Sequence, residues 1–107
     1  MDHPLKAVEF LARTAPVFAK AKAERVYLEE FRKSKKSMLA IQSDERTADQ
    51  RADYAYSHPD YLAVLDGLKA AVEAEETMRW QMVAAQAKIE IWRTESVNNR
   101  SVDRGTM

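Results

Sequence analysis

The chain has 107 residues, of which 46% are hydrophobic and 32% are charged, and its formal net charge is zero. This length allows one domain with a small hydrophobic core. The absence of cysteine excludes disulfides, thiolate chemistry and cysteine-ligated zinc, and it fits a reducing cytosol. A non-specific DNA-binding protein usually has a large basic excess, so the charge balance argues against nucleic acid as the only partner.

The residue composition predicts a single all-α domain over residues 1–107. Only two glycines and three prolines interrupt a chain that is rich in alanine, glutamate, lysine, arginine and leucine. No apolar run approaches the ~20 residues that cross a bilayer, and the N-terminus lacks the pattern of a secretory signal. We therefore expect a soluble, cytoplasmic protein with no membrane partner.

The three prolines are expected to mark helix starts, because each follows a possible capping side chain and proline is tolerated in a first helical turn. The best-defined start is "SHPD", in which Ser57 and Asp60 match a capping box. The predicted elements are a short helix at 4–13, a long helix at 16–41, a polar segment at 43–57, a long helix at 59–97 and a flexible tail at 98–107. The polar segment contains no glycine or proline, so a helical conformation is also open to it.

The last long helix carries a heptad pattern in which apolar positions alternate three and four residues apart, and only Glu75 breaks the apolar stripe. The stripe positions are Tyr61, Val64, Leu68, Ala71, Glu75, Met78, Met82, Ala85, Ile89 and Trp92. Neighbouring apolar residues such as Leu62, Val72 and Val83 are expected to widen the buried face. The partner is the first long helix, whose predicted packing face contains Val17, Ala21, Leu28, Phe31, Met38 and Ile41. The predicted fold is thus an extended antiparallel helical hairpin or a small helical bundle.

The length of the last helix predicts self-association. At ~1.5 Å per residue it would be roughly 58 Å long, whereas a compact chain of this size is only about 35 Å across. The helix therefore either bends near Gly67 or Glu75, or is covered by a second chain, and we favour a dimer. The residues assigned to an oligomer or partner interface are Met78, Trp80, Met82, Ile89 and Trp92. Core packing is the alternative role for both tryptophans.

No sequence pattern typical of an enzyme is present: there is no Gly-rich phosphate loop, nucleophile elbow or HExxH motif. The carboxylates of "EAEE" at 73–76 lack the Glu-x-x-His partners of carboxylate-bridged metal sites, and Glu75 is placed to pair with Arg79. Each histidine immediately precedes a proline and is interpreted as a helix-entry residue. We predict no catalytic residue, no metal site and no cofactor.

The basic run "RKSKK" at 32–36 is the main candidate for contact with an anionic partner, although a solvated helix face is the alternative. A second candidate is the Arg/Asn-rich end of the chain, for which the alternative is a fraying helix terminus. The predicted binding residues for nucleic acid or an acidic partner are Arg25, Arg32, Lys33, Lys35, Lys36, Arg93, Arg100 and Arg104.

Two stretches of the chain resemble known proteins: "YLEEFRKSKKSML" at 27–39 and "AAQAKIEIWRTESVNNRSVDR" at 84–104. They are similar to small helical proteins that tailed phages encode in gene modules for DNA recombination and replication. The resemblance implies a bacterial host cytoplasm and a single-strand annealing protein, an exonuclease or a single-strand-binding protein as partner. It includes no catalytic motif, so it assigns no functional residue.

These observations lead to three hypotheses of function. The first is a non-enzymatic accessory protein of phage DNA recombination or replication, which binds single-stranded or duplex DNA or a recombination protein. The second is an interaction module or inhibitor that binds a host or phage enzyme, such as a host nuclease, through the acidic stretch at 44–60. The third is a purely structural helical oligomer.

Overall fold

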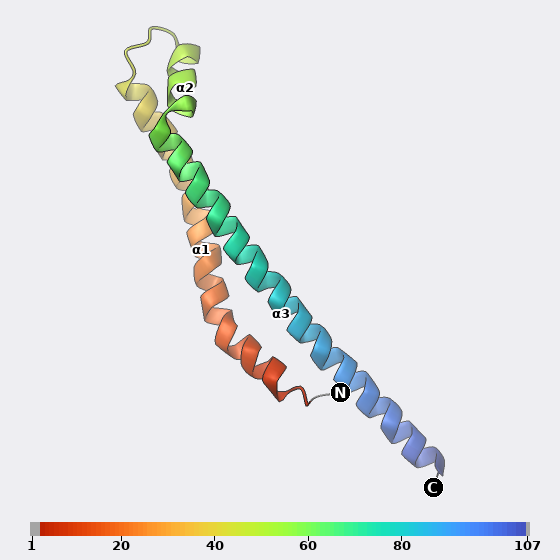
Figure 1. Ribbon diagram of the computed structural model, residues 1–107. Helices are drawn as coiled ribbons and strands as arrows, with labels where there is room; N and C mark the ends of the chain where they lie inside the picture. The colour runs from red at the N-terminus through yellow and green to blue at the C-terminus, as the bar shows by residue number, and fades with distance from the viewer. Residues whose placement is uncertain (1–2, 107) are drawn as a thin grey trace. The chain divides into compact units, whose positions relative to one another are not determined.

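The computed structural model describes residues 3–106, and this part of the chain contains three helices and no strand (Figure 1). Helix α1 spans Leu5–Gln42, α2 spans Ala48–Ser57 and α3 spans Pro59–Thr106. The predicted all-α helical hairpin is confirmed. None of the described helices combines the length and apolar character that crossing a membrane requires.

The described residues form two compact units, each built from segments of α1 and α3. The first unit combines residues 3–19 with 76–106, and the second comprises residues 20–75, which include α2. In the first unit, His3 meets Trp92 with ring centroids 6.0 Å apart. In the second unit, Arg25 pairs with Glu75, whereas Lys35, further along α1, lies near Asp60. The second unit's contacts therefore run in opposite directions along the two helices, as in an antiparallel pair.

Helix α1 continues through Pro16, so the predicted boundary between a short and a long helix is wrong. A proline inside a helix removes one backbone hydrogen bond and costs ~3 kcal/mol. However, Leu11, Thr14 and Phe18 keep a regular three-four spacing of buried or half-buried positions across the proline, while Pro16 itself is exposed. A helix break would interrupt this stripe, and burial of the stripe offsets the local cost.

Helix α3 extends to Thr106, so the predicted flexible tail at 98–107 is wrong for the residues described, and Met107 lies outside them. Residues 98–104 contain neither proline nor glycine, and nothing in them stops a helix. Arg104 in the last turn also complements the negative end of the helix dipole. The helix has no break at Gly67 or Glu75 either.

The predicted heptad stripe is the buried face of α3. All ten of its positions are buried or half-buried, and Tyr61, Glu75 and Ala85 are the most completely covered. The expected widening of this face holds only at Leu65, which is half-buried and packs against the core, whereas Leu62, Val72 and Val83 are exposed. A single neighbouring helix covers a narrow stripe and leaves its flanks open, as in a two-stranded coiled coil.

Helix α1 has a matching stripe, but its register differs from the prediction. The buried and half-buried positions with three-four spacing are Ala7, Leu11, Thr14, Phe18, Ala21, Arg25, Leu28, Arg32, Lys35 and Leu39. The expected residues Val17, Met38 and Ile41 are exposed. The stripe includes long cationic side chains, whose aliphatic stems can pack against apolar neighbours, and a count of apolar residues alone misses them.

Helix α2 lies within the predicted polar segment and packs on the other two helices. The Thr47 hydroxyl accepts a hydrogen bond from the Gln50 backbone N–H at 3.1 Å, and the Gln50 side chain accepts one from the Thr47 N–H at 3.4 Å. This reciprocal capping box starts the helix. Ala55 is fully buried and forms the core of the second unit with Leu39 and Tyr61.

His58 ends α2 and begins α3. Its backbone N–H donates to the Ala55 carbonyl, and its own carbonyl accepts the first hydrogen bonds of α3. Its Nδ1 accepts from the Asp60 N–H at 3.0 Å, and His3 Nδ1 accepts from Leu5 N–H at 3.1 Å in the same way. Both histidines are therefore helix-entry residues, as predicted. The predicted cap at Ser57 is wrong, because Ser57 is still helical and its hydroxyl donates back to the Asp53 carbonyl.

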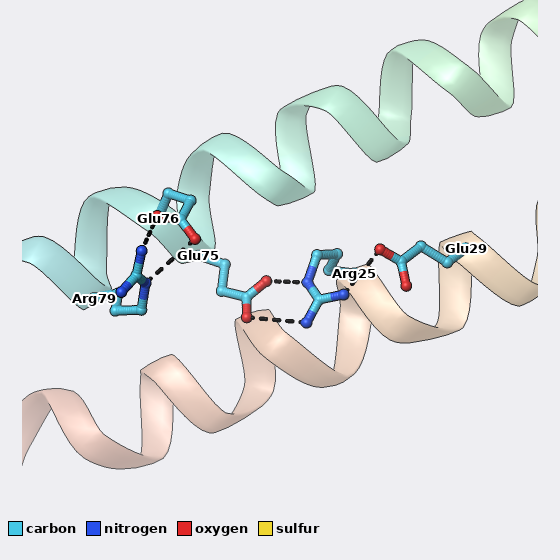
Figure 2. A network of polar contacts seen from close by, with 5 residues as sticks. All are labelled: Arg25, Glu29, Glu75, Glu76 and Arg79. Atoms are coloured by element: carbon cyan, nitrogen blue, oxygen red, sulfur yellow. Dashed lines mark hydrogen bonds and ion pairs between the residues drawn. The ribbon is translucent and has the colours of Figure 1, made fainter.

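The second unit also contains an ion pair between the two stripes, in which Glu75 is buried and Arg25 is half-buried (Figure 2). The Arg25 guanidinium donates to both carboxylate oxygens of Glu75 and, at 2.8 Å, to Glu29. Hydrogen bonding to Glu75 and then to Glu29 raises the pKa of Arg25 above its ordinary value. The predicted pairing of Glu75 with Arg79 is wrong, because Arg79 instead donates to Glu76 at 2.6 Å. A carboxylate on the buried stripe is better satisfied by the facing helix than by the exposed neighbour one turn away.

We expect His58→Ala to lower the free energy of unfolding by about 1 kcal/mol through loss of the cap. His58→Asn keeps a side-chain acceptor and should retain most of that stability. Both variants remove the ring contact with Tyr54, so the difference between them isolates the hydrogen bond to Asp60. Urea denaturation followed by circular dichroism measures it, and equal stability of the two variants would contradict the capping role.

We expect Glu75→Gln to lower the urea midpoint more than Glu29→Gln does, because Glu75 is buried and its loss leaves the half-buried Arg25 guanidinium with only Glu29 as a carboxylate partner. Glu29 is half-exposed, so its loss is screened by water. Replacing both partners, as Arg25→Met with Glu75→Leu, should restore the midpoint toward that of the native chain. Equal effects of the two single variants would show that the pair is not a core interaction.

Candidate anion-binding site

The basic run at 32–36 lies on α1 in the second unit, beside the junction of α2 and α3. Arg32, Lys35 and Lys36 are half-buried, and only Lys33 is exposed among the four cations. A helix face turned wholly to solvent would leave all four exposed. The run is therefore part of the packed surface of the hairpin, and its cations have distinct surroundings.

Two of these cations have carboxylate neighbours. Lys35 Nζ lies 3.8 Å from Asp60 Oδ2 at the start of α3. Lys33 Nζ lies 3.2 Å from Glu30 Oε1, and both side chains of this pair are largely exposed. Exposed pairs of this kind contribute little, because water and salt screen them. Lys33 thus remains able to exchange its carboxylate for another anion.

Arg32 and Lys36 have no carboxylate neighbour among residues 3–106. The Lys36 ammonium lies 4.6 Å from the centre of the Tyr56 ring, a cation–π contact that leaves its charge uncompensated. The half-buried Arg32 guanidinium has five N–H donors and forms no hydrogen bond or ion pair with any other described residue. Partial removal of an unpaired charge from water is unfavourable, and an anion from solution would relieve it.

These cations open onto a cavity of about 380 Å³ on the surface of the second unit. Its lining residues are Arg32, Lys33, Lys36, Ser37, Tyr56 and Tyr61. The lining therefore consists of three cationic and three hydroxyl-bearing side chains, with no carboxylate among residues 3–106. A planar guanidinium with adjacent hydroxyl donors suits the oxygens of a phosphate group.

The core of the unit holds the hydroxyl side of this cavity in place. Tyr61 is 6% exposed and packs with Leu39 and Ala55. The Tyr56 ring meets the Tyr61 ring edge to face, with centroids 5.3 Å apart. Helix α1 supplies the cations, while α2 and α3 supply the tyrosines. The site thus depends on correct packing of all three helices.

The other predicted anion-binding residues do not line this cavity. Arg25 is engaged by Glu75 and Glu29 in the core, so its charge is already compensated. Arg93 lies 3.3 Å from Glu90 on the surface of the first unit. Arg100 and Arg104 are exposed on the last turns of α3 in the same unit. The structure therefore brings together only Arg32, Lys33 and Lys36 from that set.

Sequence analysis missed Ser37, Tyr56 and Tyr61 as site residues. Tyr61 lies on the packing stripe, as predicted, and also lines the cavity. The available signal was the density of tyrosines in "DYAYSHPDY", directly before and after the predicted start of α3. Their approach to the basic run depends on how α2 folds back, which local sequence does not specify.

The predicted interface residues fall into two groups. Met78, Met82, Ile89 and Trp92 are half-buried on the stripe of α3. Trp80 is 59% exposed, which excludes core packing for it, and the Arg79 guanidinium lies 4.8 Å from its ring centre. Trp80 follows Met78 by two positions and so lies about 200° around the helix from the stripe. The dimer stays a prediction.

The inference about function rests on this chain's own residues. Among residues 3–106, no group of three or more His, Asp or Glu side chains could hold a metal ion. No family model, curated protein or solved structure matches the chain.

Proposed function

We propose that the chain is a non-enzymatic accessory protein that binds nucleic acid through the cavity of its second unit, with backbone phosphates as the bound groups. The observation that carries the proposal is the half-buried, unpaired Arg32 guanidinium in a cavity lined also by Lys36 and three hydroxyl-bearing side chains, with no carboxylate of residues 3–106 in the lining. Arginine, lysine, serine and tyrosine side chains are the usual partners of phosphate oxygens. The resemblance of residues 27–39 and 84–104 to tailed-phage proteins supports DNA recombination or replication as the setting.

Single-stranded nucleic acid suits this cavity better than duplex. Tyr56 lines it and is 46% exposed, so part of its ring is open to an unpaired base. Binding of single strands combines cations along the backbone with aromatic rings on which bases stack. A duplex has no unpaired base to offer, and it would gain only the phosphate contacts.

The small number of cations implies modest, salt-sensitive affinity. Three cations that each neutralise one phosphate give a slope of about −2 for the logarithm of affinity against the logarithm of salt concentration on a single strand. Such binding agrees with a chain of zero net charge, because the positive potential is local. A protein of this kind would assist another DNA-processing protein and would not coat DNA alone.

The test is fluorescence anisotropy with a labelled single-stranded oligonucleotide at several salt concentrations. We expect Arg32→Gln with Lys36→Gln to weaken binding by roughly tenfold and to flatten the salt slope from about −2 to about −1. The matched control is Lys20→Gln with Lys22→Gln, which removes the same charge from exposed positions of α1 outside the cavity. This control should change affinity little.

Equal losses in the two double variants would show that binding reflects net charge and not the cavity. Unchanged binding in Arg32→Gln with Lys36→Gln would remove the cavity from the proposal altogether. Circular dichroism of each variant checks that the helices are retained.

The role of Tyr56 is tested separately with Tyr56→Leu and Tyr56→Phe. Loss of a stacked base costs ~1–3 kcal/mol, so Tyr56→Leu should weaken single-strand binding by roughly fivefold or more. Tyr56→Phe keeps the ring and should retain most of the affinity. Binding of a duplex of the same sequence should change little in either variant. An equal loss for single strand and duplex would argue against stacking.

A further inference from the structure

We infer that the first unit contains a second, separate binding site, whose ligand is an amphipathic organic anion such as a medium-chain carboxylate. The site is a cavity of about 690 Å³ between the start of α1 and the middle of α3. Its volume lies within the range of small-molecule sites in proteins. It shares no residue with the cavity of the second unit, and the two sites are independent.

The cavity exists because small side chains face one another across the hairpin. Helix α1 contributes Ala7 and Phe10, and α3 contributes Ala84 and Ala85. Three alanines cannot fill the space between two helices, whereas leucine at such positions normally does. Ala85 is 6% exposed, and Ala7 and Phe10 are half-buried, so these residues form an apolar floor. An apolar chain placed there would replace missing packing contacts.

The rim of the same cavity is cationic. Lys6, Arg13 and Lys88 line it, and no aspartate or glutamate among residues 3–106 does. None of these three forms an ion pair with a carboxylate in the part of the chain from 3 to 106. The Arg13 guanidinium lies 5.8 Å from the centre of the Phe10 ring, at the boundary between rim and floor. Positive charge at the edge is complementary to an anionic head group.

The combination of floor and rim specifies the ligand class. An inorganic anion would use the rim but leave the apolar floor exposed to water, whereas a neutral hydrocarbon would use only the floor. A molecule with a flexible apolar body and one carboxylate satisfies both features. The cavity of the second unit differs in this respect, because tyrosine and serine hydroxyls line it together with a half-buried arginine.

The test uses isothermal titration calorimetry of the full chain with dodecanoate and dodecyltrimethylammonium below their micelle-forming concentrations and with dodecanol below its solubility limit. We expect saturable binding of one dodecanoate per chain, at least tenfold weaker binding of dodecanol and no binding of the cation. Lys6→Gln, Arg13→Gln and Lys88→Gln together should reduce dodecanoate affinity to that of dodecanol. Ala85→Leu, which fills the floor, should abolish both.

The control for the charge change is Lys20→Gln, Lys22→Gln and Lys69→Gln, which removes three cations that do not line the cavity. If Ala85→Leu disturbs folding by circular dichroism, Ala84→Leu at a neighbouring exposed lining position replaces it. Dodecanoate binding that survives the cavity-filling variant, or that keeps its native affinity in the triple rim variant, would overturn the inference. Equal affinities for dodecanoate and dodecanol would also overturn it. The same holds if dimerisation of the chain releases bound dodecanoate, because a second chain would then be the occupant of the cavity.

Discussion

The ion pair between Arg25 and Glu75 is the constraint on which the second unit depends. It places a buried carboxylate on the stripe of α3 against a half-buried guanidinium on the stripe of α1. Sliding the helices by a heptad so that Phe18 faced Glu75 would leave the carboxylate buried without a partner, which is far more costly than losing a few apolar contacts. A slide in the other direction would bring Arg32 opposite Glu75. A single polar position can specify register in this way in helical pairs. The alignment that results brings the basic run of α1 beside Tyr56 and Tyr61.

The cations on the stripe of α1 therefore have two different roles. Arg25, in the middle of the unit, is fully compensated by carboxylates and stabilises the packing. Arg32 and Lys36, about two and about three turns later, lack a carboxylate neighbour among the described residues. Their charge is left for a ligand. The cavity of the first unit is also lined by cations that lack carboxylate partners among the described residues. Its other lining residues are mainly apolar, whereas those of the second unit carry hydroxyl groups.

The stripe of α3 could be predicted because it consists almost wholly of apolar residues at heptad spacing. The stripe of α1 could not, since Arg25, Arg32 and Lys35 occupy packing positions that composition assigns to solvent. Pro16 was misleading for a related reason: tertiary burial overrides a local helix-breaking preference. For the candidate site, the basic run was identifiable, but the tyrosines were not. Their position depends on α2 folding back onto α1, which is a property of the packed hairpin.

The most direct measurement is a two-dimensional NMR titration of the ¹⁵N-labelled chain with a short single-stranded oligonucleotide at low salt, observing backbone amides and arginine Nε–H groups. The account predicts that the largest shifts occur at Arg32, Lys36, Ser37, Tyr56 and Tyr61, with Arg25 Nε–H unchanged because its hydrogen bonds to Glu75 persist. Shifts concentrated at Arg93, Arg100 and Arg104, or no shifts at all, would contradict it.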